Sequence, residues 1–234
     1  RSVMAFCKSI LVPENDSLTT ISSRNTSSKV TVLPAFTTAE ELKALAADGL
    51  LVSAGPGCPE EIPTVVANVK EMLDRASGRT VPTAGTLPMG QMLLFSGVPK
   101  DEKAMESSAM LHEKKGERFV RDEFLHEQNL LVTENGKSVL FAGCAHHGIV
   151  SILETAERIT GKRPDVVFGG FHLFRLAEGD PAGDALIEET GRKLLEGHTV
   201  YYTGHCTGDY AYNKLKAVLG DRLQPMTGGS VVEI

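Results

Sequence analysis

The stretch AGCAHHGIV, residues 142 to 150, decides how the rest of the chain is interpreted. It places Cys144, His146 and His147 directly behind the apolar run 138–141, and a helical pattern starts at once. A strand-to-helix turn that happens to contain polar residues would explain this stretch. A metal or catalytic site at the end of a buried strand would explain it equally well. The other turns of the chain are therefore needed to choose between the two.

Two further histidines occupy the same kind of position. His172 follows the apolar run 166–168 through two glycines, and His205 follows the run 200–203 through one glycine. Open α/β sheets place their sites just past the carboxyl ends of strands, and glycine lets backbone and ligand approach closely. Because imidazole is the commonest metal-ligand side chain, His146, His172 and His205 together favour one site over three unrelated turns.

The remaining candidates near these turns have simpler interpretations. His147 is expected to face outward in the first turn of the following helix. Cys144 and Cys206 lie close to candidate histidines in the sequence and are expected to be small buried residues that support the site. Three other histidines lie in charged or loop-like context and are expected to have no role in a site: His112, His126 and His198.

Composition and charge restrict the function. The chain has 234 residues, 41% hydrophobic and 23% charged, which is typical of an ordinary globular protein. Its net charge of −6 gives no basic footprint for nucleic acid or an anionic membrane. No apolar run approaches the roughly 20 residues that span a bilayer. The four cysteines form no Cys-x-x-Cys pair, which argues against a zinc finger and favours a reduced, cytoplasmic setting.

The C-terminal half alternates strands and helices around one hairpin. Asn135-Gly136 between two apolar runs is a strong type I′ hairpin signal, so a mixed sheet is expected. Residues 98–123 are charged and loop-like. The alternation predicts helices at about 148–160, 184–196 and 207–219, and strands at 91–95, 165–168, 199–203 and 230–233. Strands 138–141, 165–168 and 199–203 should share one sheet, with their carboxyl ends on one edge.

The N-terminal part reads as a β-α-β-α series. Residues 1–28 are rich in Ser, Thr and Asn and are expected to be poorly ordered. Strands are expected at 29–33 and 50–53. Thr37-Thr-Ala-Glu40 is a capping box that opens a helix ending near Gly49, and a second helix is expected at 59–76. This order favours a parallel sheet.

From about Met92 to Ile234 the sequence resembles the C-terminal half of metallo-β-lactamase-fold proteins, in particular their dihydropteroate-synthase-like branch. The matching motifs are MLLFSGVP (92–99), DEFLHEQNLLV (122–132), GCAHHGIVSIL (143–153), GGFHL (169–173), HCTG (205–208) and TGGSVVEI (227–234). The resemblance implies a mixed-sheet αββα sandwich that binds zinc or another divalent metal. It makes His146 the middle metal ligand, His205 the last, His172 a ligand for metal or a substrate anion, and Glu127 a supporting acid.

The chain departs from that family at the N-terminal ligands. The family has a His-x-His-x-Asp-His motif, whereas the first 111 residues here contain no histidine. Metal-activated water chemistry needs a well-held ion, so metal binding is expected to be weak or absent without these ligands. Three explanations are open: the activity is lost, a second copy or another chain completes the site, or the N-terminal half has been replaced.

Replacement has some support, because residues 29–66 resemble the class I glutamine amidotransferase domain of the carbamoyl-phosphate synthase small chain. The matching features are the Thr37–Glu40 helix start and the Gly55-Pro-Gly57 loop. The family's nucleophilic cysteine falls at Leu87, which has no nucleophile, so no glutaminase activity is expected. The expected organisation is a poorly ordered segment at 1–28, an amidotransferase-like segment at 29–91 and a metallo-β-lactamase-like half at 92–234.

Three functions remain open. The first is a metal-dependent hydrolase or transferase acting on a phosphate-bearing small molecule, with an ion held by His146, His205 and His172. The second is a non-catalytic, amidotransferase-like binding or interaction module. The third is a folded protein without activity.

Overall fold

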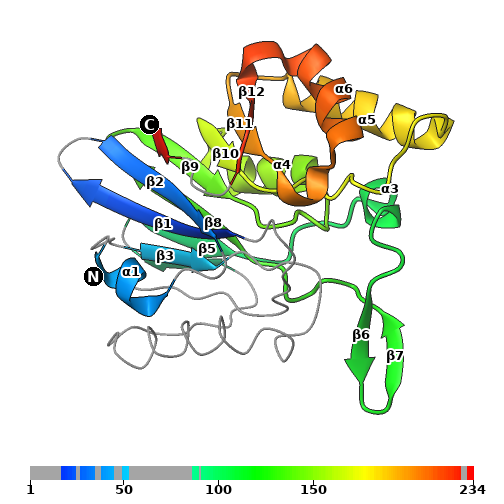
Figure 1. Ribbon diagram of the computed structural model, residues 1–234, viewed down its shortest axis with the longest axis horizontal. Helices are drawn as coiled ribbons and strands as arrows, with labels where there is room; N and C mark the ends of the chain where they lie inside the picture. The colour runs from blue at the N-terminus through cyan, green and yellow to red at the C-terminus, as the bar shows by residue number, and fades with distance from the viewer. Residues whose placement is uncertain are drawn as a thin grey trace. The chain divides into compact units, whose positions relative to one another are not determined.

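The computed structural model (Figure 1) describes residues 17–24, 27–34, 38–44, 49–52, 86–89, 91–227 and 231–234. The chain divides into two compact units. The first unit comprises residues 1–82 together with 226–234, and the second comprises residues 83–225. No helix in the described part of the chain combines the length and the apolar character needed to cross a bilayer.

The first unit contains a four-stranded sheet in the order β13-β2-β1-β3. Every neighbouring pair of strands in it is antiparallel. Its elements are β1 (Ser17–Arg24), β2 (Ser27–Pro34), α1 (Ala39–Ala44), β3 (Gly49–Val52) and β13 (Val231–Glu233). The predicted strands at 29–33 and 50–53 exist, but the parallel pairing expected for them is wrong, because β1 lies between them and runs opposite to both.

Two expectations for this unit need correction. Residues 17–24 belong to the segment expected to be poorly ordered, yet they form β1, the partner of both β2 and β3. The predicted strand 230–233 was expected to continue the C-terminal alternation, yet β13 pairs with β2. In both cases long-range pairing, which composition and local pattern do not report, decides where the strand lies.

The capping box at the start of α1 lies one residue later than expected. The Thr38 backbone N–H donates to Glu41 Oε2 at 2.8 Å, and the Glu41 N–H donates to Thr38 Oγ1 at 3.3 Å. These reciprocal bonds satisfy two backbone donors that a helix start leaves without partners. The expected helix at 59–76 lies outside the described residues.

The second unit is built on a seven-stranded mixed sheet in the order β12-β11-β10-β9-β8-β5-β4. The strands are β4 (Thr86–Met89), β5 (Met92–Phe95), β8 (Asn129–Glu134), β9 (Lys137–Phe141), β10 (Val166–Phe168), β11 (Val200–Thr203) and β12 (Leu223–Pro225). Strands β9 to β12 are parallel, and β9, β8, β5 and β4 pair antiparallel. The predicted α/β fold with a mixed sheet is confirmed, and so is the shared sheet of the three site strands.

The antiparallel part begins at the predicted hairpin. Asn135 has φ +50° and Gly136 has φ +79°, and a type I′ turn requires positive φ at both central residues. Asparagine and glycine tolerate this conformation better than other residues. The turn therefore fixes the register in which β8 pairs with β9.

Three helices of the second unit lie on the same side of strands β10 to β12 (Figure 1): α4 (Ile149–Thr160), α5 (Pro181–Leu194) and α6 (Asp209–Leu219). Two short 3₁₀ helices, η2 (His205–Thr207) and η3 (Gly220–Arg222), flank α6. Side chains from all three α-helices join one core with alternate residues of the strands, including Ile152, Leu153, Ile187, Leu194, Leu215, Leu140, Val167 and Tyr201, each 1% exposed or less.

Residues 98–123 are more ordered than the sequence suggested. They form α3 (Glu102–Glu106) and a separate hairpin of β6 (His112–Lys115) and β7 (Arg118–Arg121). Asp101 caps α3 by accepting backbone hydrogen bonds from Lys103 and Ala104 at 3.0 and 3.2 Å. The high charge density of this region suggested a loop. It is instead explained by the hairpin, because most residues of β6 and β7 are exposed.

The structure does not support the amidotransferase resemblance. A nucleophile elbow is a sharp turn from a strand into a helix. Leu87, at the expected nucleophile position, instead lies within β4 and pairs with Leu94 of the antiparallel neighbour β5. Cys7, Cys58 and the Gly55-Pro-Gly57 loop lie outside the described residues.

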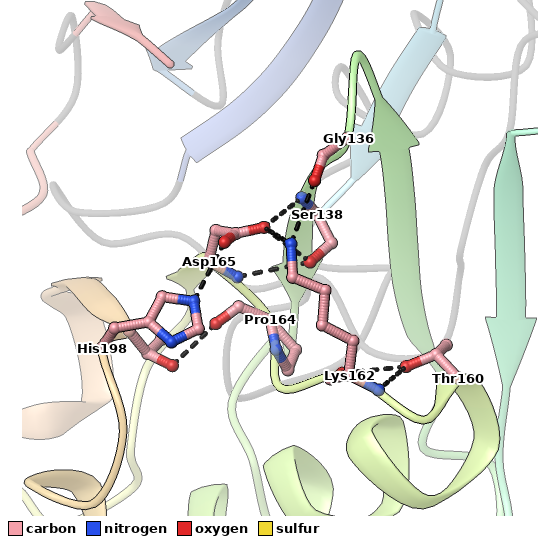
Figure 2. Close-up of polar contacts among 8 residues, drawn as sticks. Gly136, Ser138, Thr160, Lys162, Pro164, Asp165 and His198 are labelled. Atoms are coloured by element: carbon pink, nitrogen blue, oxygen red, sulfur yellow. Dashed lines mark hydrogen bonds and ion pairs between the residues drawn. The ribbon is translucent and has the colours of Figure 1, made fainter.

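A carboxylate ties together the amino ends of β9, β10 and β11. Figure 2 shows Asp165, just before β10, between Ser138 at the start of β9 and His198, which precedes β11. The Oδ2 of Asp165 accepts from the Ser138 backbone N–H at 2.7 Å and from Lys162 Nζ at 2.8 Å. Its Oδ1 lies 2.9 Å from His198 Nε2.

These contacts decide how Asp165 titrates. Burial alone would raise the pKa of the Asp165 carboxyl, but the hydrogen bonds from Lys162, Ser138 and His198 outweigh burial and hold that pKa well below its ordinary value. A depressed pKa in the folded state stabilises the fold above the unfolded pKa of about 3.9. This stabilisation is lost as the pH falls toward the lower folded pKa.

We expect Asp165→Asn to lower the free energy of unfolding at neutral pH by about 2 kcal/mol, because it removes charged hydrogen bonds from a partly buried cluster. The difference from the wild type should shrink below about pH 4, where the wild-type carboxylate begins to be protonated in the unfolded chain. Urea unfolding at several pH values measures both effects. Asp221→Asn, at an exposed position, is the control and should change stability by less than about 0.5 kcal/mol. Equal losses of unfolding free energy in the two variants would contradict a stabilising role for the Asp165 contacts.

Candidate functional site

The loops after β9, β10 and β11 meet at one edge of the sheet and bond to each other through their backbones. The Ala142 N–H donates to Phe168 O at 2.9 Å, and the Gly170 N–H donates to Gly143 O at 2.7 Å. The Gly169 N–H donates to Tyr202 O at 3.1 Å. Backbone hydrogen bonds therefore join the segments at the carboxyl ends of the three parallel strands.

Two glycines permit this close meeting. A Cβ on Gly169 would lie 3.2 Å from both Ala142 Cβ and the Gly143 carbonyl oxygen. A Cβ on Gly170 would lie 2.4 Å from Cys206 Sγ, which is closer than real atoms approach. The Cys206 thiol is 3.7 Å from the Cys144 carbonyl oxygen. The Gly169-Gly170 pair thus leaves room for the neighbouring loops, as the sequence predicted.

His146 is held on three sides. Its backbone N–H donates to Glu127 Oε1 at 2.5 Å, and its Nδ1 is 3.1 Å from Ser108 Oγ. Its ring stacks on Phe124, with centroids 4.0 Å apart and planes 7° from parallel. Glu127, the acid that the resemblance makes a supporting residue, thus fixes the backbone that carries the His146 ring.

The expectation that His147 faces outward is wrong. His147 is 3% exposed. Its Nδ1 lies 3.0 Å from Glu127 Oε2, and its Nε2 lies 3.1 Å from the Glu123 carbonyl oxygen. Burial alone would lower the pKa of His147, but these two acceptors outweigh burial and raise it, because each ring nitrogen of the protonated form can donate a hydrogen bond to one of them. The buried His147–Glu127 pair therefore helps to fix the turn that carries His146.

His172 lies beside His146, with ring centroids 4.2 Å apart and planes at 55°. His172 is 4% exposed, and neither ring nitrogen has a hydrogen-bond partner among the described residues. A buried polar group without a partner costs free energy. Such a group at the carboxyl edge of a parallel sheet is suited to binding a ligand.

The backbone near these rings is strained. Phe124 has φ +50°, Ala145 has φ +52° and His172 has φ +50°. Apart from Asn135 in the hairpin turn, these are the non-glycine residues with positive φ in the described chain. Left-handed φ in residues other than glycine costs about 1–3 kcal/mol and is found mostly at functional sites. The strained residues therefore include His172, whose ring has no hydrogen-bond partner among the described residues, and Phe124, whose ring stacks on His146.

The structure leaves one predicted site residue undecided. The His205 backbone lies at the start of η2, directly after β11. Its side chain is not among those described, so the distance between the His146 and His205 rings stays a prediction. Cys206 is 7% exposed, as expected of a small buried residue, whereas Cys144 is intermediate in exposure.

Sequence analysis missed several contributors to the site. Ser108 and Phe124 touch the His146 ring, but both come from the region interpreted as a loop or its border. Phe174 is 47% exposed and meets the His172 ring edge-on at 5.2 Å. The Arg175 guanidinium carbon lies 5.4 Å from the centre of the Phe174 ring. The motif DEFLHEQNLLV contained Phe124, yet nothing in its spacing showed that this ring would stack on His146.

The described side chains do not complete a metal site. Within the described part of the chain, no group of three or more His, Cys, Asp or Glu side chains is arranged to hold a metal ion. The His146–His172 pair fits such an ion by donor type, because imidazole nitrogen binds zinc and other late first-row ions. The structure therefore brings two of the three predicted histidines together, and the metal centre itself stays a prediction.

No family model matches the sequence. The chain is 26% identical over 176 residues to 7,8-dihydropterin-6-methyl-4-(β-D-ribofuranosyl)-aminobenzene-5′-phosphate synthase of Methanocaldococcus jannaschii. This similarity covers 73% of the chain and 58% of the relative, so the chain spans less than two thirds of the relative's length.

The fold is similar to that of the crystal structure of Tm1679, a metal-dependent hydrolase of the β-lactamase superfamily. The TM-score is 0.59 at 19% sequence identity, and the match covers 93% of this chain and 99% of Tm1679. A match to Zn²⁺-bound PqqB from Methylobacterium extorquens has a TM-score of 0.39 at 12% identity and covers 74% of this chain and 63% of PqqB. This likeness is too weak to support a conclusion about fold or function. The similarity to Tm1679 shows that the chain has a metallo-β-lactamase-like fold, as its C-terminal motifs predicted.

The close approach of Gly170 and Cys206 gives a test of how the loops after β10 and β11 pack against each other. We expect Gly170→Ala to lower the free energy of unfolding by about 1–3 kcal/mol, because the added methyl group overpacks against the thiol. Cys206→Ala in the same chain should recover most of that loss. A double-mutant cycle by thermal and urea unfolding measures this coupling. Additive effects of the two substitutions would show that these loops do not meet as described.

Proposed function

We propose that the chain is a metal-dependent hydrolase or transferase that acts on a phosphate-bearing small molecule. In this proposal His146, His172 and His205 bind a divalent ion at the carboxyl ends of β9, β10 and β11. The observation that carries it is the buried His172 ring, whose two nitrogens lack a partner among the described residues and which lies 4.2 Å from the His146 ring. The β-lactamase-superfamily fold gives this arrangement its chemical context.

The donor set favours zinc or a similar ion, held weakly. Structural zinc sites have four protein ligands, and catalytic sites usually have three. Three histidines would reach the lower number only if His205 points toward the other two. Without the family's N-terminal histidines, the site depends on these three residues, on a second copy, or on another chain that completes it.

The residues around His146 prepare it for binding. Ser108 contacts Nδ1 of His146, and in this proposal the ring binds the ion through Nε2. Glu127 and the Phe124 ring hold the backbone and the plane of the imidazole. Contacts of this kind orient metal-binding histidines, and their loss typically costs about 10–100-fold in affinity or activity. A bound divalent ion would supply Lewis-acid chemistry at a phosphoryl group.

Two observations support a phosphate-bearing substrate. Arg175 places a cation beside Phe174, whose ring meets His172, and guanidinium is the side chain best suited to pair with phosphate. The relative from Methanocaldococcus jannaschii is by name the synthase of a phosphate ester. The alternative of an amidotransferase-like binding module has no support from the fold, because Leu87 lies in a strand rather than at an elbow.

We expect the purified chain to hydrolyse p-nitrophenyl phosphate or bis(p-nitrophenyl) phosphate when zinc or manganese is supplied, and a chelator to abolish this activity. His146→Ala and His172→Ala should each lower the rate at least about tenfold, because each removes a group that holds the ion. His112→Ala, which removes an exposed histidine far along the chain from these turns, is the matched control and should retain the wild-type rate. Absence of metal-dependent turnover, or full activity in His172→Ala, would contradict the proposal.

A further inference from the structure

The β6–β7 hairpin, residues 112–121, forms a sheet of its own. Its two strands pair with each other and with no other strand of the described chain. Gly116, with φ +63°, lies in the turn between them. Figure 1 shows this hairpin, hereafter the arm, projecting away from the helices and the large sheet of the second unit. A hairpin that stands alone in water is marginally stable, so a partner surface would be expected to stabilise it.

The arm and the segments on either side of it, residues 107–111 and 122–125 (hereafter the stems), also carry unusually exposed apolar side chains. Phe119 on the arm is 70% exposed, and Met110 and Leu125 on the stems are 66% and 69% exposed. Among the large hydrophobic residues of the described chain, these three have the highest exposure. Exposed apolar groups gathered on one segment typically mark an interaction site.

Charge on the arm is opposite to that of the chain as a whole. The arm carries four cations, Lys114, Lys115, Arg118 and Arg121, and two carboxylates, Glu113 and Glu117, which gives a formal charge of +2. Since the whole chain carries −6, the rest of the chain carries −8. A second copy of this chain therefore has, outside its own arm, a net charge opposite to that of the arm. Pairing of two arms through their open edges would bring like charges together and is disfavoured.

The stems connect the arm to the candidate site. On one side, Ser108 contacts His146, and on the other side, Phe124 stacks on the same ring. Arg121 donates to the Met105 carbonyl oxygen at 3.2 Å and to Glu106 Oε1 at 3.4 Å, which fixes the base of β7 against α3. A surface that binds the arm would therefore also hold the two stems that position His146.

We propose that the arm binds a second copy of this chain, each arm of the dimer lying on the acidic body of the other copy. Reciprocal exchange closes the assembly as a two-fold dimer, whereas one-way contacts would continue into a filament. Phe119 supplies the apolar anchor, since aromatic residues dominate interface energetics. Lys114, which lies opposite Phe119 in the hairpin, and the neighbouring Arg118 orient the arm toward the net negative charge of the other copy. This inference is independent of the proposed chemistry.

The test is sedimentation velocity with the full chain over a range of concentrations. The wild type is expected to form a dimer with a dissociation constant in the micromolar range, roughly as small interfaces do. Phe119→Asp is expected to weaken the dimer at least about tenfold. Raising the salt from about 50 mM to about 500 mM is also expected to weaken it, because it screens charges. Leu195→Ser, at another exposed apolar residue (45% exposed), is the matched control and is expected to leave the dimer unchanged.

Circular dichroism melting of Phe119→Asp identifies a change in folding, and the double variant Lys114→Glu/Lys115→Glu then tests the same interface through charge alone. Two outcomes overturn the proposal. The first is a wild-type chain that is monomeric at every concentration. A monomeric chain whose arm binds an anionic polymer would count as this outcome too. The second is a dimer whose dissociation constant changes in neither the Phe119 nor the lysine variant.

Discussion

The parallel register of β9, β10 and β11 determines where every candidate site residue lies. Phe141, Phe168 and Tyr202 are aligned across the three strands, so the loops that follow them begin at the same level. Backbone hydrogen bonds from Ala142, Gly169 and Gly170 then join these loops to each other. His146 and His172 are 26 positions apart in the sequence and become neighbours only because of this register.

The two edges of the same strands have different roles. At the amino ends, the Asp165 carboxylate accepts hydrogen bonds from residues before or within all three strands, and these bonds hold the pKa of that carboxyl below its ordinary value. At the carboxyl ends, His172 is buried without a partner among the described residues, and its backbone is strained. This contrast is what we would expect of a fold that positions a binding site.

The sequence predicted most of the second unit because its signals are local. Short apolar runs located β8 to β11, helical patterns located α4 to α6, and Asn135-Gly136 specified the hairpin. The position of His172 after two glycines was also visible in the sequence. What was missed depends on long-range contacts: the pairing of β13 with β2, the incorporation of a Ser/Thr-rich segment into β1, and the burial of His147 against Glu127. The amidotransferase resemblance failed for the same reason, because short motifs near Leu87 do not specify the strand that pairs with it.

The account rests on the claim that His146 and His172 form a ligand-binding pair at the carboxyl edge of the sheet. The most direct measurement is a crystal structure of the protein grown with zinc, with diffraction data collected on both sides of the zinc absorption edge. We expect an anomalous peak at about 2.0–2.1 Å from a ring nitrogen of each histidine. An ordered His146–His172 pair without such a peak, while zinc binds at other histidines, would contradict it.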